Sequence, residues 1–155
     1  MLMTSQETLF DIAATDMNSA VINLCDCFGN VSSQTNIQFR VRYPGSYAAD
    51  RMTAKGDPHK LGTVSYTIDR GVIVINAYIS YSFTDQRSIL NGTIFDPTYL
   101  ISCMHQAADI LGDFSTLNAY ISIGSFQKFG LDYDTVVHIL QYISNQVPYN
   151  VILTV

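Results

Sequence analysis

Short runs of β-branched and aromatic residues alternate along this chain with stretches of helical spacing, and this alternation restricts the fold more than any other feature. It is typical of an α/β layer architecture, in which helices cover a sheet. We expect strands in the segments 20–24, 62–68, 72–81, 117–121 and 151–155. Between the second and third of these, Asp69-Arg70-Gly71 predicts a hairpin turn, because glycine readily adopts a positive φ.

The first expected helix spans residues 34–43 and ends before Pro44, since proline cannot continue a helix. Its apolar positions are Ile37 and Val41, with Phe39 as a further candidate.

Two further helices are indicated by their start signals. Asp96-Pro97 combines an N-cap residue with proline at the first helical position, and the helical pattern that follows stops at Gly112. The last helix starts at Asp132 or Asp134, and apolar residues with helical spacing follow it.

The chain has 155 residues, of which 48% are apolar and 14% charged, so it can build one sizeable core. We predict a single domain over residues 1–155. Its fold class is α/β, a three-layer α/β/α sandwich with a mixed central sheet of about six strands. The expected core includes Ile22, Val74, Ile101, Leu117, Val137, Leu140 and Leu153.

The charge balance restricts the possible partners. Eight Lys and Arg residues stand against thirteen Asp and Glu residues, for a net charge of −5, which argues against general binding to a phosphate backbone. A local anion site made of backbone N–H groups remains compatible with this charge. The sequence has no signal-peptide pattern and no apolar run of membrane-spanning length, so we expect a cytoplasmic protein with no membrane partner.

The cysteines do not indicate a disulfide framework or a metal site. There are three of them, an odd number, and Cys25 and Cys27 lie only two residues apart. That spacing is too short for half of a structural zinc site, and no second pair is available. We therefore expect neither a metal nor a cofactor.

Two loops are candidates for ligand binding. Ligands of open α/β sheets lie beyond the carboxyl ends of the strands. Residues 26–33 follow the first clear strand, and residues 124–131 follow the strand at 117–121.

Several segments together resemble the macro domain family. Residues 20–29 and 37–44 are similar to a strand that enters a first ligand loop, followed by a helix that ends in "FKKRYP" or a similar sequence. Residues 56–64 and 72–78 resemble the "KLG … IVNLYTQ" segment of small macro domains related to the yeast ADP-ribose phosphate phosphatase and the terminal ADP-ribose glycohydrolase.

The second loop extends the resemblance. Residues 121–124, with 131–134, are similar to the "IGxGxxGGDWE" loop and helix start of the same groups, so the likeness covers nearly the whole chain. Small macro-like proteins of this length also occur in large bacteriophages, which the chain resembles in general style. For a phage-encoded protein, the expected location is the host cytoplasm.

The resemblance implies a cleft for ADP-ribose, or for a related NAD-derived nucleotide, at the crest of the sheet. Asp11, followed by Ile12, matches the position whose carboxylate accepts a hydrogen bond from the adenine amino group. The alternative is that Asp11 caps a turn. Asn23 stands where the phosphatase group has an active-site histidine, and it either orients a water or a ribose hydroxyl or is a core amide.

The first loop departs from the family pattern and keeps only Gly29 of its glycines. Asp26 stands where the resemblance places an asparagine at the distal ribose. It is either a ribose acceptor and general base or a turn residue. Asp132 aligns with a carboxylate near the distal ribose, although an aspartate at a helix start also fits a simple cap. Asp26 and Asp132 are the candidate catalytic pair.

The second loop is expected to contact the ligand through Gly124, Ser125, Phe126, Lys128, Phe129 and Gly130. Its backbone N–H groups would form an anion nest for the diphosphate. One phenylalanine would lie against the distal ribose or the adenine, and the lysine would pair with a phosphate oxygen. The alternative is a surface loop with one solvated lysine.

Three functions are compatible with these residues. The first is hydrolysis at the distal ribose, as an ADP-ribosyl hydrolase that frees ADP-ribose from an ADP-ribosylated protein or nucleic acid, or as an ADP-ribose phosphate phosphatase. The second is a non-catalytic reader or sponge for an ADP-ribose-like nucleotide, which needs the same cleft without catalytic groups. The third is a macro-like scaffold whose cleft has closed.

Overall fold

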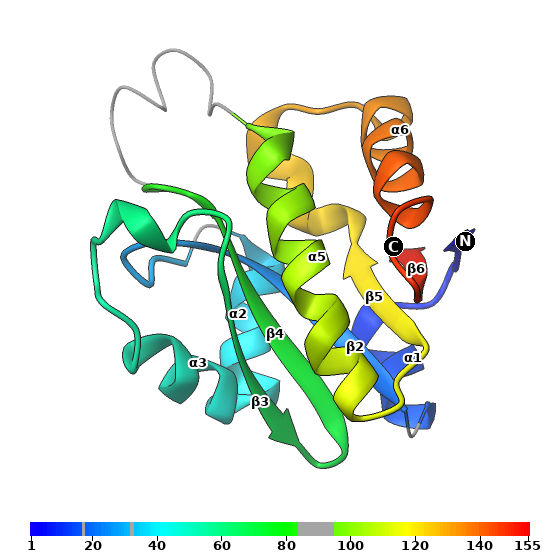
Figure 1. Cartoon of the computed structure of the whole chain (residues 1–155), viewed down its shortest axis with the longest axis horizontal. Coiled ribbons are helices and arrows are strands. Elements are labelled where there is room, and N and C mark those ends of the chain that lie inside the picture. The colour runs from blue at the N-terminus through cyan, green and yellow to red at the C-terminus, as the bar shows by residue number, and fades with distance from the viewer. Residues whose placement is uncertain (17, 32, 84–94) are drawn as a thin grey trace.

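The computed structural model describes the chain except for residues 17, 32 and 84–94. Its elements, labelled in Figure 1, are β1 (Leu2–Thr4), α1 (Leu9–Thr15), β2 (Ser19–Asp26), α2 (Gln34–Arg42), α3 (Pro44–Arg51), the 3₁₀ helix η1 (Pro58–Lys60), β3 (Val64–Asp69), β4 (Val72–Ser80), α5 (Pro97–Asp113), β5 (Asn118–Ser122), the 3₁₀ helix η2 (Ile123–Phe129), α6 (Tyr133–Ser144) and β6 (Asn150–Thr154).

The described strands form one six-stranded sheet in the order β1-β6-β5-β2-β4-β3. Neighbouring strands are parallel except β3 and β4, which form an antiparallel hairpin. Arg70 and Gly71 connect the two with φ angles of 49° and 85°. Two positive φ angles match the twist of a hairpin, so the predicted turn and the predicted mixed sheet are both confirmed.

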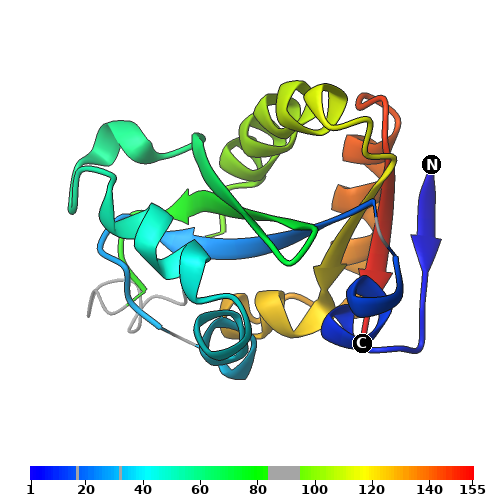
Figure 2. The ribbon, with the colours of Figure 1, turned by 90° about the horizontal axis from the view of Figure 1, so that it is seen from below.

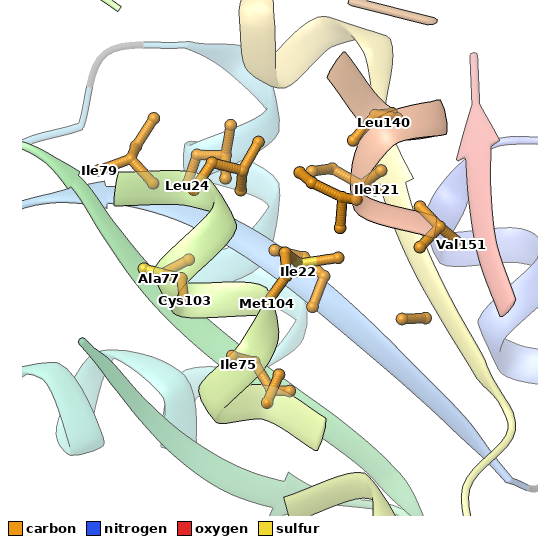
Figure 3. Close-up of a cluster of buried hydrophobic side chains, with 14 of the residues drawn as sticks. Ile22, Leu24, Ile75, Ala77, Ile79, Cys103, Met104, Ile121, Leu140 and Val151 are labelled. Atoms are coloured by element: carbon orange, nitrogen blue, oxygen red, sulfur yellow. The ribbon is translucent and has the colours of Figure 1, made fainter. Parts of the chain in front are cut away.

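Helices cover both faces of this sheet, which confirms the three-layer α/β/α architecture. Figure 2 shows α5 on one side of the strands and α1 and α2 on the other. Successive side chains of β2 point to opposite faces. Ile22 and Leu24 therefore pack with α5 and α6 in the larger hydrophobic cluster (Figure 3), whereas Val21 packs with Leu9 of α1 and Phe39 of α2.

Most of the predicted core is confirmed. Four members are at most 2% exposed, namely Ile22, Val74, Leu140 and Leu153. Ile101 and Val137 are partly buried and pack against the core. The prediction for Leu117 is wrong, because this residue precedes β5 and its side chain is 65% exposed.

Only one of the three apolar positions of α2 is buried. Phe39 is fully buried, whereas Ile37 and Val41 are 41% and 70% exposed. The helix turns Asn36 toward the sheet together with Phe39, because the Asn36 amide donates to Asn23 on β2. The inward side of α2 thus combines one aromatic ring with a polar contact to β2.

Among the strands and α-helices, β1, α1 and α3 are not predicted from the sequence, and the 3₁₀ helices η1 and η2 are expected only as loops. Pro44 does end α2, as expected, but it also occupies the first turn of α3, where its missing N–H costs nothing. None of the helices in the described parts of the chain is long and apolar enough to cross a membrane.

Candidate functional site

The carboxyl ends of the parallel strands β2, β4, β5 and β6 meet at one edge of the sheet, which we call the crest. Loop 1 (residues 26–33) leaves β2 at this edge, and loop 2 (residues 124–131) follows β5. The start of α1 lies there as well, because β1 runs parallel to β6. The fold therefore gathers both predicted ligand loops at the edge where α/β sheets bind ligands.

A cleft of about 340 Å³ opens at the crest between α1, α2 and the ends of β5 and β6. This volume is at the lower end of the range for small-molecule sites, ~300–1,000 Å³. Its walls include Phe10, Asp11, Gln34, Gln38, Arg42 and Ser122. The three α2 residues, Gln34, Gln38 and Arg42, are not identified as site residues from the sequence, although their spacing of four places them on one helix face.

Asp11 lies in this crest cleft, in the first turn of α1. The helix is capped by Thr8, whose hydroxyl accepts from the backbone N–H of Asp11 at 3.2 Å, so the cap is not the Asp11 carboxylate. Within the described structure, that exposed carboxylate has no hydrogen-bond donor. The neighbouring Ile12 packs partly buried against the cluster around Phe39 instead of lining the cleft.

Asp26 is fully buried and organises loop 1. Its Oδ1 accepts from the backbone N–H groups of Phe28 at 3.0 Å and Asn30 at 2.9 Å. Its Oδ2 accepts from the Asn30 side-chain amide at 2.7 Å and from the N–H of Phe83 at 2.9 Å. Both oxygens are thus occupied by protein donors, an arrangement that favours a structural role over proton transfer.

Asn23 belongs to a chain of buried amides on the α2 side of the sheet. Its Oδ1 accepts from Asn36 at 2.8 Å, and its Nδ2 donates to Asn76 Oδ1 at 3.1 Å. Asn76 in turn donates to the backbone oxygen of Ser46 at 2.9 Å. Asn23 is therefore a core amide whose partners are other side chains, and it lines a cavity of only about 30 Å³, the size of a water site.

Two predicted glycines stand where a side chain would collide. Gly29 in loop 1 has a φ of 74°, and a Cβ there would lie 2.9 Å from Asp50 Oδ2. At the start of loop 2, a Cβ on Gly124 would lie 2.8 Å from Thr35 Oγ1, so loop 2 passes directly against the first turn of α2. Gly130 ends η2 with a φ of 66°.

The two phenylalanines of loop 2 point into the core. Phe126 is 1% exposed, and its ring packs edge to face against Phe95 at a centroid distance of 5.9 Å. Phe129 contacts Phe95 at 5.0 Å and Phe83 at 6.2 Å. These rings attach loop 2 to the larger hydrophobic cluster.

Lys128 and Ser125 are the polar side chains of loop 2 with unusual surroundings. Lys128 Nζ donates to the backbone oxygen of Phe83 at 3.1 Å and lies 3.8 Å from the centre of its ring. Burial lowers the pKa of Lys128 to about 8, although the charge of Asp26 opposes this shift. The buried Ser125 hydroxyl has no hydrogen-bond partner in the described structure.

Asp132 is exposed and caps α6, with its carboxylate accepting from the N–H of Thr135 at 2.8 Å. The hydrogen bond from the Thr135 backbone also lowers the pKa of Asp132. Every contact that the structure gives this carboxylate is the contact of a helix cap.

The cysteines are not poised for nucleophilic chemistry. All three are buried and free. Burial raises the pKa of Cys27 to about 11 and of Cys103 to about 12, and it raises that of Cys25 well above the ordinary value, so the thiols stay protonated near neutral pH. In the described residues, no three His, Cys, Asp or Glu side chains gather closely enough to hold a metal ion.

The sequence matches no family model and no curated protein. Its structure, however, is similar to macrodomains. The macrodomain of Mycobacterium tuberculosis DarG superposes with a TM-score of 0.75 at 16% identity, over 99% of this chain and 97% of that one. A macrodomain protein from Streptomyces coelicolor gives a TM-score of 0.70 at 12% identity, over 100% and 99%.

A third similar structure is Thermosipho africanus DarTG in complex with ADP-ribose, with a TM-score of 0.66 at 7% identity, over 88% of this chain and 38% of that one. These similarities establish that the chain has the macrodomain fold. A bacteriophage origin and a cytoplasmic location stay predictions from the sequence.

Proposed function

We propose that this chain, built on the macrodomain fold, binds ADP-ribose in the crest cleft with the adenine beside Asp11. The observation that carries the proposal is an exposed carboxylate without a described donor, at the rim of a cleft at the carboxyl ends of the strands. The similar fold of a DarTG solved with ADP-ribose supports the choice of nucleotide.

The Asp11 carboxylate suits adenine over guanine. Adenine carries an exocyclic amino group that donates a hydrogen bond, whereas guanine has a carbonyl oxygen at the corresponding position. A carboxylate accepts from the first and repels the second. Phe10 offers an apolar ring in the same cleft, with the Arg42 guanidinium 5.2 Å from its centre.

The rest of the nucleotide would extend along the crest between α2 and loop 2. The cleft volume suits the nucleoside half of ADP-ribose, which leaves the diphosphate over the close approach of Thr35 and Gly124. Helix N-termini favour anions, and α2 begins at this point. The hydroxyl of Ser125, which has no partner in the described structure, is a candidate donor to the ligand after a small movement of the loop.

The site supports binding without hydrolysis better than it supports catalysis, so a reader or sponge is the form of the proposal. Hydrolysis needs a carboxylate that can exchange a proton at the distal ribose. Asp26 is surrounded by protein donors, and Asp132 caps α6. Neither of the two carboxylates meets this requirement in the described structure.

Calorimetric titration with ADP-ribose and GDP-ribose tests the binding step. We expect ADP-ribose to bind more tightly, and Asp11→Ala to weaken it by roughly ten- to a hundred-fold, the equivalent of losing about 1.5–3 kcal/mol from a hydrogen bond to a charged group. Binding of GDP-ribose should hardly change. Glu7→Ala is the matched control, because Glu7 is an exposed acid near α1 that does not line the cleft.

Equal losses for the two nucleotides would show that Asp11 only supports the loop. A separate experiment tests hydrolysis. The protein is incubated with ADP-ribosylated protein, ADP-ribosylated nucleic acid and ADP-ribose carrying a terminal phosphate, and the products are analysed by mass spectrometry. Release of ADP-ribose or phosphate would show that the protein is an enzyme and would overturn the proposal of a reader or sponge.

A further inference from the structure

The positive charges of this acidic chain are concentrated in one segment. Five of its eight Lys and Arg residues lie between residues 40 and 60, where only two acidic residues occur. This segment covers the end of α2, α3 and η1, and it runs past loop 1 at one side of the molecule (Figure 1). A net charge of −5 for the whole chain therefore conceals a local excess of cations.

A cavity of about 290 Å³ lies within this segment, between loop 1, α3 and η1. Its walls include Arg51, Lys55 and Lys60 and the rings of Phe28 and Tyr47, and Asp50 is the only carboxylate among the described residues of the lining. The part of the lining that the structure describes thus carries three cations and one anion. None of its described residues also lines the crest cleft.

Lys60 is unusual because it is buried, with 7% of its surface exposed. Its ammonium donates to the backbone oxygen of Cys27 at 3.2 Å, and it lies 4.0 Å from Asp50 Oδ1 and 4.4 Å from the centre of the Tyr78 ring. An ammonium has three N–H donors. Only one of them has a hydrogen-bond acceptor in the described structure, so donor capacity remains at the wall of the cavity.

Asp50 does not fully neutralise this site. Its Oδ1 accepts a hydrogen bond of 2.7 Å from the Tyr78 hydroxyl, and Lys60 stands beyond hydrogen-bond distance. Buried charges are costly unless they are paired. The two further cations at the rim of the cavity, Arg51 and Lys55, have no carboxylate within ion-pair distance in the described structure. An oxyanion would complete the arrangement.

We propose that this cavity is a second ligand site, which binds a small organic phosphate. The phosphoryl group would lie at Lys60, with Lys55 and Arg51 at its outer side. The cavity volume corresponds to roughly ten water molecules at about 30 Å³ each, more than a phosphoryl group fills. The remaining space lies along Phe28 and Tyr47, whose rings suit a planar or apolar organic group.

A ligand in this site would change the hydrogen bonding of loop 1. The backbone oxygen of Cys27 accepts hydrogen bonds from Lys60 Nζ at 3.2 Å and from the N–H of Gly56 at 2.7 Å. A phosphate that draws the Lys60 ammonium outward removes the first of these bonds. The ligand would thus act on loop 1 from the side of α3 and η1.

Amide NMR titration with inorganic phosphate and with phenyl phosphate tests the proposal, because it reports each site separately. We expect both probes to shift the amides of Thr53, Lys55 and Lys60, with phenyl phosphate binding more tightly because its ring reaches the aromatic wall. Lys55→Gln should weaken binding by about two- to fivefold, as for an exposed charge pair. Lys60→Gln should weaken it by about tenfold or more.

The matched control is Arg70→Gln, since Arg70 is an exposed cation on the β3–β4 hairpin, outside both sites. If Lys60→Gln does not fold, the pair Lys55→Gln and Arg51→Gln carries the test. Three results would overturn the proposal: no shift in residues 51–60, shifts confined to α1 and loop 2, or equal losses in the Lys55 and Arg70 variants. None of them depends on whether ADP-ribose binds at the crest.

Discussion

Replacement of Asp26 by asparagine separates a structural role from a catalytic one. The change keeps the size of the side chain but replaces one carboxylate oxygen by an amide –NH₂. Each oxygen of Asp26 now accepts two hydrogen bonds, all between 2.7 and 3.0 Å, in a fully buried position. The new –NH₂ group would therefore face two donors.

The cost follows from these contacts. A hydrogen bond to a charged group contributes about 1.5–3 kcal/mol, so the loss of two gives at most about 3–6 kcal/mol. A small rearrangement of loop 1 around the new amide would recover part of this loss. We therefore expect Asp26→Asn to lower the free energy of unfolding by about 2–4 kcal/mol.

Thermal and urea unfolding measure this effect. For a domain of this size, 1 kcal/mol corresponds to about 2–4 °C, so the expected decrease in Tm is roughly 5–15 °C. Asp132→Asn is the matched control and should leave Tm nearly unchanged, because asparagine caps a helix as well as aspartate does. An Asp26→Asn protein with wild-type stability would refute the reasoning. If the wild-type protein hydrolyses one of the ADP-ribosyl substrates and such a stable variant does not, Asp26 is a catalytic residue.

Two other predictions concern the loops of the crest. Burial lowers the pKa of Lys128 from 10.5 to about 8, so between pH 8 and 10.5 the unfolded chain binds more protons than the folded one, and stability should rise with pH. The unfolding free energies of wild type and Lys128→Met, measured from pH 7 to 10.5, isolate this contribution. Parallel curves for the two proteins would contradict it. Gly29→Ala should cost more stability than Gly71→Ala, since both residues have positive φ but only a Cβ on Gly29 would lie within 2.9 Å of another atom, Asp50 Oδ2. We expect a loss of about 2 kcal/mol or more for Gly29→Ala and about 1 kcal/mol for Gly71→Ala. Equal decreases in Tm would show that the Asp50 side chain moves away freely.

Local patterns in the sequence were enough for the layers of the fold. The runs at β2, β4 and β6 predict buried strands because they are rich in β-branched residues, and Asp96-Pro97 predicts the start of α5 because capping depends on neighbouring residues alone. The hairpin at Arg70-Gly71 followed for the same reason. Residue order and short-range sterics determine these features.

The identity of the buried polar groups was decided only by the tertiary structure. An aspartate after a strand has the same local pattern whether it meets a ribose or the N–H of Phe83, which lies 57 residues further along the chain. In the same way, Asn36 rather than Ile37 faces the sheet because β2 presents an amide there. Lys60 is buried because the Cys27 carbonyl, 33 residues earlier, accepts from it. Hydrogen bonds between distant residues set these positions, and no periodicity in the sequence encodes such pairings.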